Sequence, residues 1–521
     1  NDSGFLQALL SHGTFDGYYY VRKSDTPPDI AECYRDSDRL KPISLSSLHR
    51  LDECGPLVLF TSSILFQQYA SFRLARKHPD WPICGITHTL STIYPRVSFG
   101  SSRLFAFDAL ICTTPSARQT LEHLMCEHAK STAVTQPTPP LPTIRYPVIP
   151  LGVDPAMVGD LGLKGVARRH LGIAEDDIVF LFLGRLSRTN KVDFHPLIRI
   201  FIETPGLPDG SRLIVAGDDT RHHLATELLD FASQFGSPRT VSVMPDITVE
   251  QKRMLLSASD VFIAVSDTIE ETFGISVVEA MMSSLPVIAS DWDGYRHLVR
   301  HAREGWLVPT YICGDGLELS AISSLFACEY HYTQRVCLDL DALSHAMWVL
   351  ANKPDLRKQY GEAARRRALS EFAWPSVLRR YEELWHEQLR EAAAAMQSAD
   401  DLSYPAVYDY SAVFRHYATD AISVQDHVTV SRDYRRLMDL LRRNGLFLRP
   451  DPTFYPEVDE QIVEQCVQAG TLKVGEIVER LVRPDLPPLL LVSHVCRLIK
   501  NGLLVLCRAS TPQGLSHEIH D

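Results

Sequence analysis

Short apolar runs alternate with amphipathic segments through the first third of the chain. The runs lie at 57–61, at 83–87 around Cys84 and at 109–113, and helical patterns such as ARQTLEHLMCEHA lie between and after them. Continuous apolar runs are typical of parallel strands buried on both faces. Repeated strand–helix alternation therefore predicts a doubly wound α/β domain over residues 1–150.

A second alternating block predicts a second Rossmann-like domain over residues 151–375. Its expected strands lie at 178–184, 212–217, 260–265 and 286–290, with helices at 248–259 and 274–283. A further helix, over 376–398, has Pro375 near its first turn and is expected to cross back to the first domain. The fold class predicted is thus α/β, with two Rossmann-like domains that face a cleft.

Three segments interrupt this alternation. The stretch 3–13 has the pattern of a helix that follows a strand, and we expect the strand itself to be missing from the sequence given. The Pro/Thr-rich stretch 132–155 predicts a surface loop that leads into an interdomain connector. An irregular insert is expected from about 310 to 336.

The last stretch, 400–521, predicts a separate and mainly helical accessory domain that ends in an apolar run, LLVLC. Its helix–helix–strand order loosely resembles a winged helix. A DNA-binding version needs a basic recognition helix, but LLLVSHVCRLIK offers only Arg497 and Lys500. We therefore expect a module for protein contact or oligomerisation.

Composition narrows the function classes. The 521 residues are 45% hydrophobic and 22% charged, which is the balance of a globular protein rather than a disordered one. A net charge of −12 argues against a global nucleic-acid binder. The 11 cysteines form no CxxC pair and indicate reduced core residues in a cytosolic protein. No run reaches the ~20 apolar residues of a membrane span and no signal peptide is visible, so we expect a cytoplasmic protein, with peripheral attachment to the inner face of the membrane left open.

Candidate chemistry lies just after the predicted strands, because ligands of open α/β sheets bind beyond the carboxyl ends of the strands. Gly184 and Arg185 follow one strand, with Lys191 six residues beyond Arg185. Two cations beside a tight turn suit a diphosphate, although such a pair is also common on solvated surfaces.

A second candidate segment holds two glutamates. Glu271, Phe273 and Gly274 precede a predicted helix, and a glycine at a helix start lets backbone amides approach an anion. Glu279 lies eight residues after Glu271, and a carboxylate can accept two hydrogen bonds from a ribose diol. An ordinary surface glutamate is the alternative, but its apolar neighbours imply burial and hence a partner.

Weaker candidates complete the set. His88 follows a predicted strand and is either a ligand contact or a structural residue. The loop at Met244–Ile247, after TVSVM, could pack on a base, and Gly4 could belong to a phosphate-facing glycine loop. Trp292 and Tyr295 could stack on a sugar, although core packing is favoured.

These residues carry a resemblance to a known family. The chain resembles family 4 glycosyltransferases of the GT-B fold in three segments. These are Glu271-Thr-Phe-Gly followed after four residues by Glu279-Ala-Met, the Gly184-Arg185-Leu186 motif with Lys191, and VIPLGVD at 148–154. The resemblance covers roughly residues 1–390. Val192 and the pair Val265-Ser266 depart from the usual glycine and proline-serine.

The resemblance implies transfer of a sugar from a nucleotide-sugar donor, a UDP- or GDP-sugar, with retention of configuration and with no metal or other cofactor. It implies that Arg185 and Lys191 hold the diphosphate, that Glu279 binds the ribose, that Glu271 contacts the donor sugar, and that the amides of Phe273 and Gly274 cap the phosphate or sugar. His88 would contact the donor sugar or the acceptor, which is a saccharide, a lipid-linked sugar or a protein.

Two other hypotheses stay open. A non-catalytic nucleotide-sugar scaffold or sensor, with 400–521 as its interaction module, would keep the same donor residues. A transcription-associated protein whose tail binds DNA is the third.

Overall fold

The computed structural model describes residues 2–21, 37–43, 45–64, 66–76, 78–87, 90, 104–133, 144–188, 191–312, 336–397, 422–443, 455–483, 486 and 488–507. The chain divides into two compact units. Unit 1 comprises Asn1–Thr14 and Pro56–Ser403, and unit 2 comprises Phe15–Gly55 and Tyr404–Asp521. This division differs from the expected 1–150 domain, because 15–55 falls in the other unit.

The first lobe of unit 1 is built on a parallel sheet of order β3-β4-β5. Its strands, β3 (Leu59–Thr61), β4 (Ile83–Ile86) and β5 (Ala109–Ile111), lie within the three predicted apolar runs. The helices described in this lobe are α1 (Asp2–His12), α3 (Gln67–Ala75) and α5 (Pro115–Ala133). A fully buried bidentate pair, Arg73 with Asp108 at 2.7 and 2.8 Å, ties α3 to the segment before β5.

The second lobe is a six-stranded parallel sheet of order β11-β10-β9-β6-β7-β8. The expected strands appear as β6 (Ile178–Leu183), β7 (Ser211–Gly217), β9 (Val261–Ala264) and β10 (Val287–Ser290), and β8 (Thr240–Pro245) and β11 (Gly305–Val308) extend the sheet. The helices are α6 (Lys164–Leu171), α7 (Phe194–Glu203), α8 (Ala225–Ser233), α9 (Val249–Ala258), α10 (Ile275–Met282), α11 (Tyr295–Leu298), α14 (Leu340–Asn352) and α15 (Pro354–Glu371).

Both faces of this sheet are buried, which explains the continuous apolar runs in the sequence. In β6, Val179 and Leu181 face one hydrophobic cluster, and Phe180 and Phe182 face the other. Helix α10 contributes to the first cluster and α7 and α14 to the second. Side chains that alternate between two cores leave a strand no polar face, as parallel sheets require.

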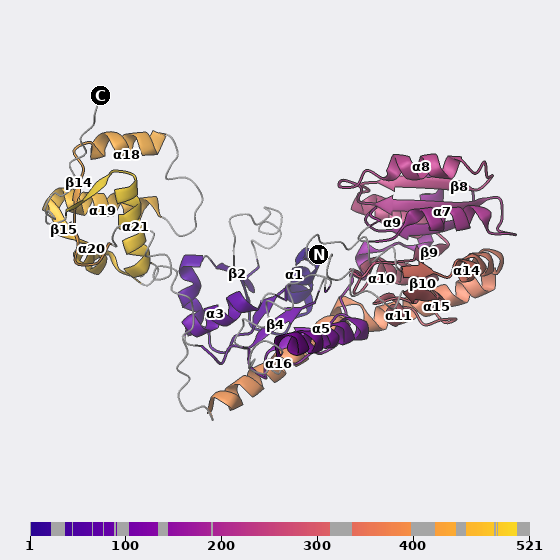
Figure 1. Cartoon of the computed structure of the whole chain (residues 1–521), viewed down its shortest axis with the longest axis horizontal. Helices are drawn as coiled ribbons and strands as arrows, with labels where there is room; N and C mark the ends of the chain where they lie inside the picture. The colour runs from indigo at the N-terminus through magenta and orange to yellow at the C-terminus, as the bar shows by residue number, and fades with distance from the viewer. Residues whose placement is uncertain are drawn as a thin grey trace. The chain divides into compact units, whose positions relative to one another are not determined.

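Helix α16 (Trp374–Gln397) connects the second lobe with the first, in the place expected for a returning helix (Figure 1). Near its start the Trp374 indole lies where a Cβ on Gly152 would be 2.2 Å away, so the connector before the second lobe needs glycine there. Further along, the Gln388 amide donates to the Ile83 and Phe107 carbonyls at 3.1 and 2.9 Å. The helix therefore fastens directly to the first-lobe sheet.

Unit 2 contains a parallel pair, β1 (Tyr18–Val21) and β2 (Leu40–Ile43), and a 3-10 helix, Leu45–Glu53. Its C-terminal part has a three-stranded antiparallel sheet of order β15-β14-β16, formed by β14 (His427–Val430), β15 (Thr471–Lys473) and β16 (Leu504–Cys507). The helices are α18 (Tyr434–Arg443), α19 (Pro456–Ala469), α20 (Val474–Leu481) and α21 (Pro488–Lys500). The sequence predicted the helices and the last strand, but not β14 in the middle of a sheet.

The described ranges contain no helix that is both long and apolar enough to cross a bilayer.

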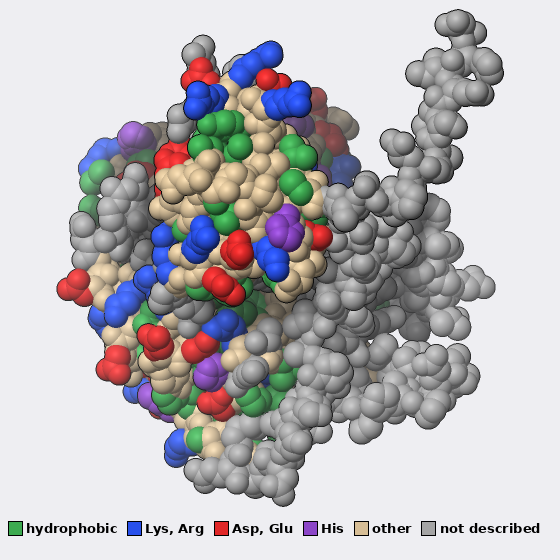
Figure 2. Space-filling view, turned by 90° about the vertical axis from the view of Figure 1, so that its left-hand side faces the viewer, with side chains coloured by type: hydrophobic (Ala, Val, Ile, Leu, Met, Phe, Trp, Pro, Cys, Tyr) green, Lys and Arg blue, Asp and Glu red, His purple; other side chains and the backbone are tan. Residues whose placement is uncertain are grey.

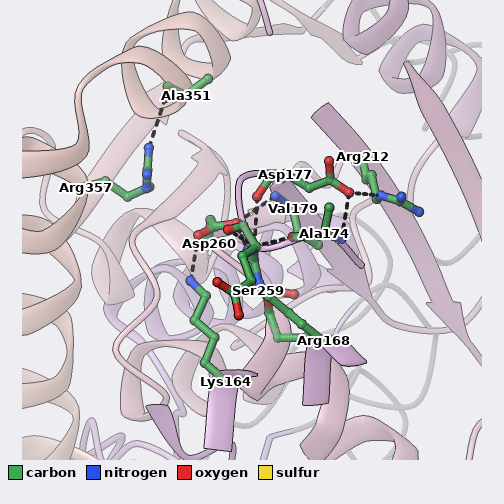
Figure 3. Close-up of polar contacts among 12 residues, drawn as sticks. Lys164, Arg168, Ala174, Asp177, Val179, Arg212, Ser259, Asp260, Ala351 and Arg357 are labelled. Atoms are coloured by element: carbon green, nitrogen blue, oxygen red, sulfur yellow. Dashed lines mark hydrogen bonds and ion pairs between the residues drawn. The ribbon is translucent and has the colours of Figure 1, made fainter. Parts of the chain in front are cut away.

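A charged network closes the amino end of the second-lobe sheet (Figure 3). Asp260, which precedes β9, accepts hydrogen bonds from Lys164 Nζ at 2.6 Å, Arg168 Nη2 at 2.6 Å and the Val179 amide at 2.8 Å. Arg168 is itself buried and also donates to the Ala258 carbonyl at 3.0 Å. Both carboxylate oxygens are satisfied, so the network stabilises the junction of α6, β6 and β9.

We expect Asp260→Ala to lower the free energy of unfolding by about 3–5 kcal/mol, because it leaves the buried Arg168 without its carboxylate partner. The change is measured by urea denaturation followed by tryptophan fluorescence, because all six tryptophans lie in unit 1. Glu122→Ala is the control: it removes an exposed pair with Arg118 and should change stability by no more than about 0.5 kcal/mol. Equal effects of the two substitutions would show that the Asp260 network is not structural.

Candidate functional site

The candidate site begins where strands β6 and β7 end side by side. Gly217 has a φ of +147°, and a Cβ there would lie 1.9 Å from the Gly184 carbonyl oxygen. Only glycine allows this approach. Beyond it, the Leu186 amide donates to the Asp218 carbonyl at 2.8 Å, which fixes the turn that carries Arg185.

Lys191 and Glu271 meet at this edge of the sheet. Lys191 Nζ lies 2.5 Å from Glu271 Oε2, and their side chains are 22% and 11% exposed. The Tyr295 hydroxyl donates to the same oxygen at 3.3 Å. Ser266 Oγ donates to the Lys191 carbonyl at 2.9 Å, so the loops after β6 and β9 are tied together. Two residues far apart in sequence thus form one partly buried ion pair.

Glu279 has a partner that the sequence did not identify. Lys252 Nζ of α9 lies 2.6 Å from Glu279 Oε1 on α10, and the two side chains are 28% and 13% exposed. The sequence argument that this carboxylate needs a partner is answered by Lys252. No local pattern links the two, because the contact depends on how α9 packs beside α10.

Gly274 makes the sharp entry into α10. Its φ is +105°, and a Cβ would lie 2.4 Å from the Tyr295 ring. Phe273 is buried and packs edge-on to Phe372 at 6.1 Å between ring centroids. The peptide that links Glu271 to the helix is therefore held from both sides, and the helix start is directed at the same edge as Lys191.

Arg185 differs from Lys191 in its surroundings. It is exposed on the turn after β6. The pKa of Asp218 is lowered, first by hydrogen bonds from Thr220 and further by the charges of Arg221 and Arg185. The structure thus places Arg185 at the rim of the site, next to a carboxylate and in contact with solvent.

Two aspartates near the ion pair have raised pKa values. Burial raises the pKa of Asp267 to about 7, and the charge of Asp193 raises it further. Burial raises the pKa of Asp293 to about 7 as well, with the charge of Glu271 as the next cause. Sequence reasoning missed both residues, although each lies in a segment it had examined.

The first lobe touches this site through hydroxyl groups. Thr113 Oγ1 and Thr114 Oγ1 donate to the Thr272 carbonyl at 3.3 and 3.0 Å. Ser116 Oγ donates to the Asp293 carbonyl at 3.1 Å and lies 2.8 Å from His297 Nε2. These contacts join the start of α5 to the two loops that surround Glu271.

Three weaker candidates fare differently. The glycine-loop prediction for Gly4 is wrong, because Gly4 lies inside helix α1. The neighbouring Phe5 ring packs on Trp374 with 5.6 Å between ring centroids, and this contact holds the helix in place. Met244 lies in β8, not in a loop, and its half-buried side chain packs on the core of the second lobe. His88 lies outside the described residues.

The two aromatic candidates are packed rather than free. The Trp292 indole donates to the Thr268 carbonyl at 2.8 Å, and Tyr295 is 5% exposed. The preference for packing over stacking on a sugar is confirmed for both residues. Tyr295 still reaches the site, through its hydroxyl on Glu271.

Comparison with known proteins now identifies the second lobe. Residues 164–315 match the family model described as Glycosyl transferases group 1. This lobe is a group 1 glycosyltransferase domain. It carries the candidate donor-side residues discussed above except Gly4 and His88, and the resemblance to GT-B glycosyltransferases is confirmed at the level of group 1.

Curated relatives match the glycosyltransferase domain over part of their length. The D-inositol 3-phosphate glycosyltransferase of Geodermatophilus obscurus is 32% identical over 165 residues, 31% of this chain and 36% of the relative. That of Stackebrandtia nassauensis is 28% identical over 279 residues, 52% and 58% of the two chains. The alpha-maltose-1-phosphate synthase of Mycolicibacterium smegmatis is 25% identical over 248 residues, 47% and 54% of the two chains. The chain thus spans about a third to just over half of these relatives.

Solved structures share the two-lobed fold. A glycosyltransferase from Rickettsia africae aligns with a TM-score of 0.53 and 14% identity, over 75% of this chain and 93% of that one. Anabaena HepE in complex with UDP aligns with a TM-score of 0.50 and 14% identity, over 77% and 97%. The expected GT-B architecture of two Rossmann-like domains is confirmed.

The raised pKa of Asp267 predicts a pH-dependent stability. Between pH 4 and pH 7 the native state holds a proton that the unfolded chain releases, so the free energy of unfolding falls as pH rises through this window. Asp267→Asn removes the contribution of Asp267 to this slope, although Asp293 keeps its own, and the variant should be more stable than the wild type at pH 8. Thermal unfolding of both proteins at pH 5 and pH 8 measures it. A wild-type stability that rises between pH 5 and pH 7, with no change in Asp267→Asn, would contradict the assignment.

Proposed function

We propose that the chain is a retaining glycosyltransferase that moves a sugar from a nucleotide-sugar donor to a saccharide, lipid-linked or protein acceptor. The observation that carries the proposal is the Lys191–Glu271 ion pair at the carboxyl edge of a group 1 glycosyltransferase domain. A cation placed there can meet a diphosphate, and a carboxylate beside it can meet the sugar attached to that diphosphate.

In this proposal, each charged group acts on a different part of the donor. Lys191, with Arg185 at the rim, stabilises the negative charge that develops on the departing nucleotide diphosphate. The amides of Phe273 and Gly274 at the start of α10 add their dipoles to the same task. These fixed charges support a reaction that uses no metal ion.

Glu279 accepts hydrogen bonds from the ribose hydroxyls, and Glu271 accepts them from the donor sugar. Before the donor binds, Lys191 and Glu271 neutralise each other. A bound diphosphate competes with Glu271 for the ammonium group, which frees carboxylate oxygens for the sugar. The ligand-free ion pair thus keeps both side chains in place until the donor arrives.

The donor is a UDP- or GDP-sugar in this proposal. One structural relative, HepE, was solved in complex with UDP. The loop after β8 is a candidate for contact with the base, because Asp246 has a φ of +51° and its amide donates to the Gly217 carbonyl at 2.6 Å. This contact brings the loop to the end of β7, on the side of the sheet where the nucleotide would bind.

The C-terminal part of unit 2 fits a protein-contact or oligomerisation role better than a nucleic-acid role. In α21, His494 is buried 2.7 Å from Asp459, and Arg497 lies 3.7 Å from the same carboxylate. Figure 2 shows basic and acidic side chains interspersed on the face in view. DNA binding favours a continuous basic surface. We place the protein in the cytoplasm, where a lipid-linked acceptor would require peripheral contact with the membrane.

A donor screen tests the proposal. Thermal shifts with UDP-glucose, GDP-mannose, ADP-glucose and dTDP-glucose should reveal at least one stabilising nucleotide sugar, because a ligand that binds only the folded chain raises its melting temperature. Lys191→Ala and Glu279→Ala should weaken that binding by about 10-fold or more, which corresponds to about 1.4 kcal/mol.

Lys358→Ala and Glu362→Ala are the matched controls, since both residues are exposed on α15. They should bind the same nucleotide sugar as the wild type does. Wild-type-like binding and turnover in Lys191→Ala and Glu279→Ala would refute the proposed site. Intact binding with no transfer to any member of a broad acceptor panel would favour a nucleotide-sugar sensor instead.

A further inference from the structure

Three hydroxyl side chains of the first lobe gather on two carbonyl groups of the second lobe. Thr113 and Thr114 both donate to the Thr272 oxygen, and Ser116 donates to the Asp293 oxygen. Thr113 and Thr114 are almost fully buried, at 2% and 3% exposure. We refer to Thr113, Thr114 and Ser116 as the hydroxyl clamp.

The proton positions in the clamp are determined by counting donors. Ser116 has one hydroxyl proton, and the Asp293 carbonyl can only accept it. The contact of Ser116 Oγ with His297 Nε2 at 2.8 Å therefore requires His297 to donate. Burial lowers the pKa of His297, and the charge of Arg296 lowers it further, which favours a neutral ring with its proton on Nε2. Each hydrogen bond of the serine then has a defined direction.

Thr114 is equally saturated. Its hydroxyl donates to the Thr272 carbonyl at 3.0 Å and accepts from the Ala117 amide at 3.1 Å, where it caps the first turn of α5. The Thr114 side chain thus both caps α5 and joins its first turn to the second lobe. A shift of either lobe would break a hydrogen bond between buried groups and leave each group unsatisfied, which is unfavourable.

The two carbonyls belong to the backbone that carries the site. Thr272 is the residue between Glu271 and Phe273, and Asp293 precedes Gly294. Gly294 packs so closely on the other loop that a Cβ would lie 2.6 Å from the Thr272 oxygen. The loops 271–274 and 291–294 therefore form one packed layer, with the hydroxyl clamp on its first-lobe side.

We propose that Thr113, Thr114 and Ser116 are positioning residues that hold Glu271 in its reactive place and make sugar transfer depend on docking of the first lobe. The inference rests on the proposed glycosyltransferase function. Nucleotide binding involves second-lobe residues, whereas transfer also requires the Glu271 loop to be in place. Loss of the clamp should therefore lower kcat much more than it weakens nucleotide binding.

The test compares the double variant Thr113→Val/Ser116→Ala with the wild type; Thr114 is left intact because it caps α5. Thr120→Val, an exposed position on the same helix, is the matched control. Thr113→Ser/Ser116→Thr keeps both hydroxyls and should restore wild-type behaviour. Hydrogen exchange of peptides that cover 268–276 and 291–298 reports the loops directly, without any ligand.

In the Val/Ala variant, we expect exchange of these peptides to accelerate by about 10-fold, as the loss of about 1.4 kcal/mol implies. Turnover of the nucleotide sugar selected in the donor screen should fall by about 10- to 100-fold, as a misplacement of about 1 Å produces. The Kd for UDP or GDP should rise much less than turnover falls, because Arg185, Lys191 and Glu279 lie outside the loop that the clamp holds.

Exchange and turnover that match Thr120→Val would overturn the clamp. So would a variant whose UDP or GDP binding falls as far as its turnover, because the effect would then lie in the nucleotide site. If the wild type neither binds nor turns over any nucleotide sugar, the proposed function fails, and the exchange of the ligand-free chain still decides whether the hydroxyls order the loops.

Discussion

The second-lobe sheet is covered on both faces, and this constraint determines where the charged groups next to its strands can lie. Strands such as β6 offer no polar face, because Val179 and Phe180 enter opposite cores. Charged side chains that border the strands are therefore confined to the two ends of the sheet, while others lie on the exposed faces of the covering helices. The charged groups at the two ends are arranged differently: those at the amino end maintain the fold, and those at the carboxyl end form the candidate donor site.

At the amino end, charge and hydrogen bonds are in balance: Asp260 has a partner for each oxygen. At the carboxyl end, two further carboxylates, Asp267 and Asp293, lie in the loops next to the Lys191–Glu271 pair. Glu271 occupies the ammonium group, while Asp267 and Asp293 have raised pKa values because burial disfavours their ionised forms. A set of acids that resist ionisation leaves the positive charge of Lys191 less opposed than a count of carboxylates suggests. Such a region can accept a phosphate group without first releasing several fixed anions.

The sequence allowed the central strands and the charged candidates Lys191, Glu271 and Glu279 to be predicted, since these depend on local pattern, but it did not predict that Lys191 and Glu271 form an ion pair. Apolar runs marked the central strands, and the spacing of Glu271 and Glu279 placed both near the start of α10. Lys252 could not be found in this way, because it meets Glu279 only through the packing of α9. The half-buried β8 lacks a continuous apolar run, which is why Met244 was placed in a loop. Gly4 was misjudged because glycine favours several backbone conformations and only the surrounding aromatic packing selects the helix.

Contacts between the lobes are the hardest to read from sequence, because the acceptors are main-chain carbonyls. Any residue at 272 or 293 offers the same oxygen, so the second-lobe side of the clamp leaves no mark in the sequence. Only the hydroxyls at 113, 114 and 116 are encoded by side chains, and they lie in a helix start where such residues are common as caps. A backbone acceptor also keeps its place when nearby side chains change. The side chains of the first lobe that face the sugar acceptor can thus change while three hydroxyls maintain the geometry of the donor site.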